Sequence, residues 1–262
     1  EELLEELTWI ARPKRVLVLY WYSEQSPSNV AVDRGFRSVL RSERALNVEY
    51  YAEYLESNQF SGERQEQVLH DYLRKKYEAL PIDVVVASAG ASHAFLLAHR
   101  ETLFPNAPLV FLAGSHLYEP VATGPGSTGI GAYRDFPKRL DLALRLHPGT
   151  DHVFIISGSP ENDRRFERIA RDELQGFNPE VAVTYLTDLS LDELVANVKQ
   201  LPPRSVILFA SQRSRNEQGT VLESADILGA IAPVASVPIY AMFASRVGSG
   251  VVGGEVFSSE GN

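Results

Sequence analysis

The stretch KRVLVLYWYSEQSP, residues 14–27, decides the fold class of this chain. It begins with an unbroken apolar run over 16–19, which is typical of a parallel strand buried on both faces. Two aromatic side chains, Trp21 and Tyr22, and several hydrogen-bonding side chains follow the predicted strand 14–20, and a helical apolar pattern comes next. In open α/β sheets ligands bind at the carboxyl ends of the strands, so we expect a ligand-binding site here. The alternative is that Trp21 and Tyr22 only cover the edge of the sheet.

The rest of the chain alternates between apolar runs of strand length and helical patterns. The runs predict further strands over 46–54, 82–87, 108–113, 128–133, 152–157, 180–186, 204–210 and 237–242, and a short extended piece over 253–258. The predicted helices include 62–80, one capped by Asp135, one opened by the capping box of Ser190 and Glu193, and 219–232. This alternation indicates right-handed βαβ units and parallel sheets, which is the α/β class.

A change of composition divides the chain in two. Residues 114–133 are rich in Gly, Pro, Ser and Thr and interrupt the alternation, which begins again at Asp135. We therefore expect two doubly wound, Rossmann-like lobes. The predicted domains are 1–133, which includes an N-terminal helix over 1–11, then 134–257, and finally 258–262 as the truncated start of a return crossover.

Composition excludes several classes of function. The chain has 262 residues and a formal net charge of −9, which opposes binding to nucleic acid. It contains no cysteine, which excludes disulfides, thiolate metal sites and cysteine nucleophiles. No apolar run approaches the roughly 18 residues of a membrane helix, so we expect membrane contact only through segments outside this chain.

No motif in the sequence indicates catalysis, a metal site or a cofactor site. Gly248, Gly250 and Gly253 match G-x-G-x-x-G, but no helix pattern or downstream acidic residue follows them. The six histidines show no metal-ligand spacing, and only His116 falls in a strand-end loop, where it is a candidate ligand contact. We therefore predict no catalytic residues, no metal and no cofactor.

The loops at the predicted strand ends present the chemistry of a binding module. The candidate ligand-binding residues of the first lobe are Trp21, Tyr22, Ser23, Gln25, Ser88, Ser92, Ser115 and His116. Those of the second lobe are Ser157, Ser159, Asp163, Gln212, Arg213, Phe243 and Arg246. Aromatic side chains suit an apolar ligand body, arginines suit a carboxylate, and small residues expose helix N-terminal N–H groups to an anion. The alternatives are that the serines only cap helices and turns and that the arginines are solvated surface charges.

Three stretches carry a resemblance to a known family. They are KRVLVLYWYSEQSP at 14–27, PLVFLAGSHLYEPVATGPGSTGIGAYRDFPKRLDLALRLHPGTDHVFIIS at 108–157, and VPIYAMFASRVGSGVVGG at 237–254. Together they resemble the ABC-transporter substrate-binding-protein-like domains of the class I periplasmic binding protein superfamily. The resemblance implies two α/β lobes with an interlobe cleft that closes on a ligand, and hinges near 133–134 and 257–262. We expect no counterpart of the family's closing helix within residues 1–262, which is where the chain departs from the family.

The resemblance also implies a function. Residues 14–27 look more like the branch of extracytoplasmic sensor domains of two-component histidine kinases, so we predict a periplasmic or extracytoplasmic ligand-binding sensor domain that is not itself an enzyme. One alternative is the solute-binding protein of an ABC importer, and another is a cytoplasmic α/β enzyme that uses the same cleft. The expected partner is a small molecule such as an amino acid or an aromatic acid, and a homodimer remains open.

Overall fold

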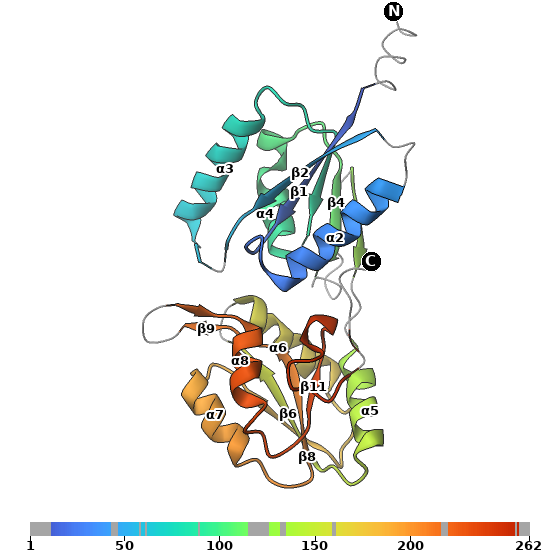
Figure 1. The fold of residues 1–262 in the computed structure, drawn as a ribbon, viewed down its shortest axis with the longest axis vertical. Helices are drawn as coiled ribbons and strands as arrows, with labels where there is room; N and C mark the ends of the chain where they lie inside the picture. The colour runs from blue at the N-terminus through green and yellow to red at the C-terminus, as the bar shows by residue number, and fades with distance from the viewer. Residues whose placement is uncertain are drawn as a thin grey trace, which may run out of the picture. The chain divides into compact units, whose positions relative to one another are not determined.

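The computed structural model describes residues 12–42, 47–57, 59–60, 62–88, 90–114, 126–131, 135–158, 161–215, 220–254 and 256. These residues form two compact units, one that ends at Gly131 and one that begins at Asp135 (Figure 1). We call them the N-terminal unit and the C-terminal unit. No helix among the described residues combines the length and the hydropathy needed to cross a membrane.

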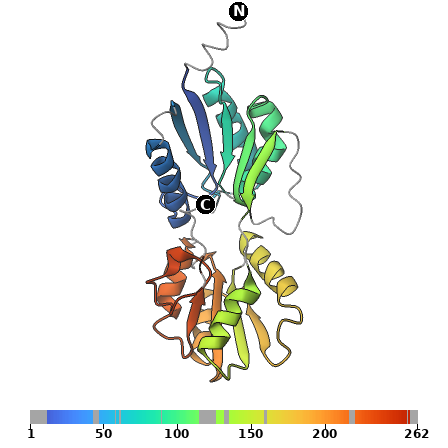
Figure 2. The same ribbon diagram turned by 90° about the vertical axis from the view of Figure 1, so that its right-hand side faces the viewer.

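The N-terminal unit is built on a five-stranded parallel sheet with the order β2-β1-β3-β4-β5. The strands are β1 (Lys14–Tyr20), β2 (Val48–Tyr54), β3 (Val84–Ala87), β4 (Leu109–Gly114) and β5 (Ser127–Gly131). The helices are α2 (Pro27–Ser42), α3 (Glu63–Tyr77) and α4 (Gly90–Leu103). Figures 1 and 2 show α2 on one face of the sheet and α3 and α4 on the other.

Strand β1 supplies the core on both faces of this sheet. Because successive side chains of a strand point to opposite faces, Leu17 and Leu19 pack in the cluster that includes side chains of α3 and α4. Val18 and Tyr20 pack in the cluster on the α2 face. The unbroken apolar run of the sequence is therefore a strand covered by helices on both sides.

The C-terminal unit has a four-stranded parallel sheet with the order β11-β8-β6-β7 and a two-stranded antiparallel ribbon, β9-β10. The strands are β6 (His152–Ser157), β7 (Ala182–Leu186), β8 (Ser205–Ser211), β9 (Ser214–Arg215), β10 (Val221–Leu222) and β11 (Ile239–Ala241). The helices are α5 (Phe136–Leu146), α6 (Glu161–Glu173), α7 (Leu191–Lys199), α8 (Ser224–Ile231) and the 3₁₀ helix η1 (Ala244–Arg246).

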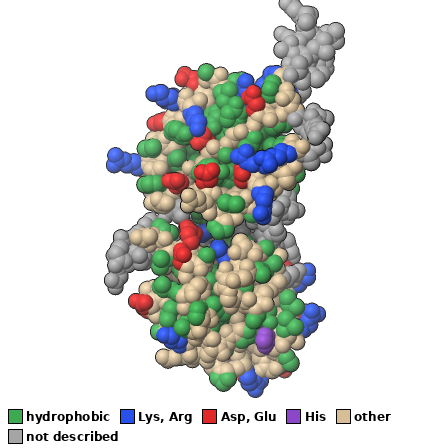
Figure 3. Space-filling view, in the orientation of Figure 1, with side chains coloured by type: hydrophobic (Ala, Val, Ile, Leu, Met, Phe, Trp, Pro, Cys, Tyr) green, Lys and Arg blue, Asp and Glu red, His purple; other side chains and the backbone are tan. Residues whose placement is uncertain are grey.

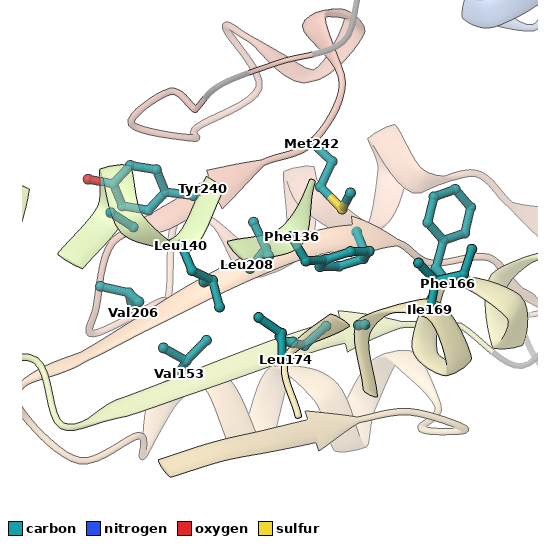
Figure 4. Packing of buried hydrophobic residues seen from close by; sticks show 14 residues of the cluster. Phe136, Leu140, Val153, Phe166, Ile169, Leu174, Val206, Leu208, Tyr240 and Met242 are labelled. Atoms are coloured by element: carbon teal, nitrogen blue, oxygen red, sulfur yellow. The ribbon is translucent and has the colours of Figure 1, made fainter. Parts of the chain in front are cut away.

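Two buried clusters cover the faces of the C-terminal sheet. On one face Phe136 and Leu140 of α5 and Phe166 of α6 pack on the sheet, close to Met242 (Figure 4). Residues of α7 and α8 cover the other face. Strand β8 lies between β6 and β11, and all seven of its residues are buried. These two sheets confirm the predicted doubly wound α/β class.

Local signals in the sequence set several helix starts. The Asp135 side chain accepts a hydrogen bond from the Lys138 backbone N–H at 2.8 Å, and Ser190 and Glu193 form the predicted capping box. The predicted helix over 219–232 is wrong in its first residues, because Val221–Leu222 pairs with Ser214–Arg215. Helix α8 begins only at Ser224, after a capping box that Glu223 and Asp226 form. The predicted N-terminal helix over 1–11 lies outside the described residues.

Candidate functional site

The last residues of β6 and β8 form a buried polar corner at the carboxyl edge of the C-terminal sheet. Ser157 and Ser211 are paired in the ladder, and the Gly158 N–H donates to the Ser211 carbonyl at 2.8 Å. Ser157 is completely buried, and the four apolar residues of β6 that precede it are buried as well. Its hydroxyl oxygen has no hydrogen-bond partner among the described residues.

Gln212 follows β8 directly, and all of its polar atoms except one form hydrogen bonds. Its backbone N–H donates to Ser224 Oγ at 3.3 Å, and its carbonyl accepts from the same hydroxyl at 2.8 Å. Its Nε2 donates to the carbonyl of Leu189 at 3.3 Å. The Leu189 carbonyl can only accept, which fixes the orientation of the amide. The remaining oxygen, Oε1, is buried and has no partner among the described residues.

The order of the strands brings the Gln212 amide to the end of β6. Leu189 lies between β7 and α7, and β6 separates β7 from β8 in the sheet. The hydrogen bond from Gln212 to Leu189 therefore spans the carboxyl end of β6, where Ser157 lies. Two residues that the sequence predicted separately thus share one corner of the sheet.

The other predicted residues of the C-terminal unit have structural partners. Arg213 Nε lies 2.8 Å from Glu223 Oε2, so a protein carboxylate already neutralises this guanidinium. The ring of Phe243 meets that of Phe166 edge to face at 5.8 Å, and Phe243 packs against the core beneath it. Arg246 is the last residue of η1 and is partly exposed. A ligand-binding role of these three residues stays a prediction.

The loop after β1 in the N-terminal unit is stabilised by its own hydrogen bonds. The Ser23 carbonyl accepts from the Ser26 N–H at 3.1 Å and from Asn29 Nδ2 at 2.8 Å. Trp21 packs partly against the core, and its carbonyl accepts from the Ser57 hydroxyl at 2.8 Å. Tyr22 is half-buried and Gln25 is exposed at the same edge. Buried Ser26 and Asn29, which the sequence analysis did not single out, hold this loop.

Ser88 is the N-terminal counterpart of Ser157. It comes directly after β3 and before α4, and its N–H donates to the Leu19 carbonyl at 3.1 Å. The residue is 9% exposed, and its Oγ has no hydrogen-bond partner among the described residues. Ser92 is fully buried in the first turn of α4. The structure therefore places two predicted serines at the start of α4.

Four predicted residues cannot be placed in the same way. Ser115, His116 and Ser159 lie outside the described residues. Asp163 falls within α6, but its side chain is not among those described.

A chain of hydrogen bonds on the α2 face was missed by the sequence analysis. The Tyr50 hydroxyl donates to Asp33 at 2.7 Å, and the Tyr20 hydroxyl lies 2.8 Å from that of Tyr50. Arg37 donates to the same carboxylate at 2.7 Å. Burial raises the pKa of Tyr50, and its hydrogen bonds to Tyr20 and Asp33 raise it further, so the phenol stays neutral. These contacts join β1, α2 and β2, and no spacing of residues within one element predicts them.

Two histidines meet across helices, which their spacing in the sequence did not reveal. The rings of His70 on α3 and His99 on α4 lie 5.1 Å apart. Nε2 of His99 is 2.8 Å from Glu66, and Nδ1 of His70 is 3.2 Å from Asp71. Within the described part of the chain, no group of three or more His, Asp or Glu side chains is arranged to hold a metal ion.

Charged side chains of both signs are scattered over the visible face of the N-terminal unit (Figure 3). On α2 of this unit, Arg37 and Asp33 form an ion pair at 2.7 Å. The face therefore lacks the single-sign field that attracts polyelectrolytes.

The sequence matches no protein-family model and no curated protein. The structure is similar to that of the ABC domain in complex with L-Trp from Streptococcus pneumonia, with a TM-score of 0.66, 15% identity, and coverage of 95% of this chain and 80% of that chain. A conserved domain protein from Vibrio cholerae gives a TM-score of 0.65 at 14% identity, with coverage of 92% and 79%. An ABC-transporter solute-binding protein from R. palustris in complex with benzoate gives 0.62 at 12% identity, with coverage of 90% and 65%. The chain therefore shares the α/β fold of these three structures, and its described residues form two units that are each built on a parallel sheet.

Proposed function

We propose that this chain is an extracytoplasmic binding protein for a small molecule and that it acts by binding rather than by catalysis. The ligand is an amino acid or an aromatic acid, recognised by polar groups at the carboxyl edge of a parallel sheet.

One observation carries the proposal. Each unit ends a central strand of its sheet in a buried serine whose hydroxyl is unpaired among the described residues, Ser88 after β3 and Ser157 in β6. Buried polar groups are nearly always hydrogen-bonded, so unpaired ones call for an explanation. Ligands of open α/β sheets bind at this edge. The similar structures, which hold L-Trp and benzoate, support the same class of ligand.

The finer role has two candidates. Similar structures that are named as an ABC domain and as an ABC-transporter solute-binding protein favour the solute-binding protein of an importer. The sensor domain of a histidine kinase rests on the resemblance of residues 14–27. The full-length gene distinguishes them, since a sensor is followed by a membrane span and a kinase region, whereas an importer component is encoded beside a permease and an ATPase.

A thermal-shift screen of this chain tests the binding function. The panel contains the proteinogenic L-amino acids, benzoate and the hydroxybenzoates, each at millimolar concentration. A ligand at a hundred times its Kd stabilises the folded state by about 2.7 kcal/mol, which is several degrees in Tm. We expect at least one compound to raise Tm, and calorimetry then gives its affinity.

Three variants locate the site. We expect Ser88→Ala and Ser157→Ala to weaken binding of the compound found in the screen. Ser38→Ala, which removes an exposed hydroxyl of α2, is the matched control and should leave the affinity unchanged. A screen in which no compound raises Tm contradicts the proposed function, and equal affinities of the three variants contradict the proposed site.

A further inference from the structure

The polar corner of the C-terminal sheet contains more than one unsatisfied atom. Ser157 Oγ and Gln212 Oε1 are both buried and without a hydrogen-bond partner among the described residues, and so is Ser214 Oγ two residues further along the chain. They come from the end of β6, the residue after β8 and the start of β9. Burial of such atoms is costly unless something completes their hydrogen bonds.

The hydrogen bonds that hold Gln212 decide which kind of ligand group can bind at this corner. Ser224 fixes the backbone of Gln212 on both its N–H and its carbonyl, and Leu189 takes the amide Nε2. A flipped amide would put Oε1 against the Leu189 carbonyl, where two acceptors repel each other. The side chain therefore presents a fixed acceptor, and an acceptor is completed only by a donor.

On the basis of the proposed binding function, we propose that the C-terminal unit recognises a hydrogen-bond donor of the ligand, an ammonium or a hydroxyl group. Gln212 Oε1 accepts this hydrogen bond, and the Ser157 hydroxyl, which both donates and accepts, completes the contact. A carboxylate at the same place would meet the lone pairs of Oε1 and be rejected. Ser224 is a positioning residue, because it holds Gln212 without itself offering an unpaired atom.

Affinity ratios test this inference directly. Isothermal titration compares L-phenylalanine, L-3-phenyllactate and 3-phenylpropanoate, which carry an ammonium, a hydroxyl and a hydrogen on the same carbon. The corresponding indole series, L-tryptophan, indole-3-lactate and indole-3-propionate, is measured in parallel. We expect the better of the two donor-bearing members to bind at least about tenfold more tightly than the donor-free member, which is the usual size of one specific hydrogen bond.

Variants show whether Gln212 is the source of that preference. Gln212→Leu should reduce the ratio to less than about threefold, since the acceptor is gone. Ser224→Ala should reduce it partly, and Ser224→Thr, which keeps the hydroxyl, should restore it. Each ratio compares two ligands on the same variant. A general loss of stability lowers both affinities alike and therefore leaves the ratio unchanged. If Gln212→Leu does not fold, Ser157→Ala supplies the same comparison.

The outcomes separate this inference from the proposed function. If the donor-free acid binds the wild-type chain as tightly as the amino acid and the hydroxy acid, the inference is overturned and the binding function stands. A preference that persists in Gln212→Leu also overturns it. If none of the six compounds binds and no compound of the wider screen raises Tm, both the proposed binding function and this inference are contradicted.

Discussion

Arg213 and Glu223 form an ion pair, with Nε and Oε2 2.8 Å apart, at the base of the β9–β10 ribbon. In the antiparallel ladder Ser214 faces Leu222, so Arg213 and Glu223 are the next pair along it. The residues beyond them, Gln212 and Ser224, are joined by two hydrogen bonds. The ion pair therefore holds the two chain segments that position Gln212.

Breaking this ion pair should destabilise the C-terminal unit. The Arg213 side chain is 12% exposed and that of Glu223 is 34% exposed, so the pair is intermediate between surface and interior. We expect Arg213→Ala to lower the free energy of unfolding by about 1–3 kcal/mol, between the values for exposed and buried pairs. Urea unfolding of the two single variants and of Arg213→Ala/Glu223→Gln gives the coupling energy.

The chain offers a matched control for this cycle. Arg145 and Asp141 lie 3.6 Å apart on α5, and their side chains are 71% and 59% exposed. Their coupling energy should be about 0.5 kcal/mol or less. Equal coupling energies of the two pairs would show that the ribbon does not depend on Arg213.

Gly129 should not tolerate a side chain. It faces Phe111 in the β4–β5 ladder, and an added Cβ would clash with the carbonyl and the ring of Phe111. We expect Gly129→Ala to cost about 1–3 kcal/mol, as overpacking does. The midpoint of urea unfolding at constant m-value measures the loss.

A glycine-to-alanine substitution in a helix should change the stability of the chain in the opposite direction. Gly229 lies in α8, and an added Cβ would have no neighbour within 4 Å. Gly229→Ala should stabilise the chain by about 0.5–1 kcal/mol, because alanine favours the helix over glycine. A gain in stability from Gly129→Ala would mean that β5 moves away from Phe111 at little cost.

Asp83 should make stability depend on pH in the acid range. Its carboxylate accepts from the Arg15 N–H at 2.8 Å and from Arg12 Nη1 at 3.1 Å. Burial alone would raise the pKa of Asp83, but these hydrogen bonds and the Arg12 charge outweigh it and hold the pKa below its usual value of 3.8. A folded-state pKa below the unfolded one gives a contribution that is complete above about pH 4 and is lost as the pH falls through the folded-state pKa.

The variant Asp83→Asn isolates this contribution. At neutral pH it should be less stable than the wild type by about 1–3 kcal/mol, the value of hydrogen bonds to a charged group. The difference should shrink as the pH falls below about 4. Urea unfolding at a series of pH values measures it, with Glu101→Gln, an exposed position of α4, as the control. A difference that stays constant down to pH 2 would show that the carboxylate charge is not involved.

The sheets were predictable because their signals are local. The apolar run at the start of residues 14–27 is a strand buried on both faces, and Asp135 and Ser190 cap the helices that their spacing predicted. The start of α8 was not predictable in the same way. Val221 and Leu222 satisfy a helical pattern as well as a strand, and their pairing with Ser214 and Arg215 decides the outcome.

The candidate site could be predicted from the sequence only as a set of positions. Ser88, Ser157 and Gln212 were predicted as candidates because each comes directly after or at the end of a strand, where ligands of open α/β sheets bind. What separates them from their neighbours is the state of their hydrogen bonds, which depends on residues far away in the sequence. Gln212 is fixed by Leu189, 23 residues before it, and Arg213 is neutralised by Glu223, 10 residues after it.

The complete burial of β8 has a consequence for the entropy of binding at its end. A strand that is paired on both sides and covered on both faces opens only when the whole unit opens. Ser211 and Gln212 at its end are thereby as immobile as the interior. Any group that docks at this edge would meet a surface that is already rigid, so little conformational entropy would be lost on docking.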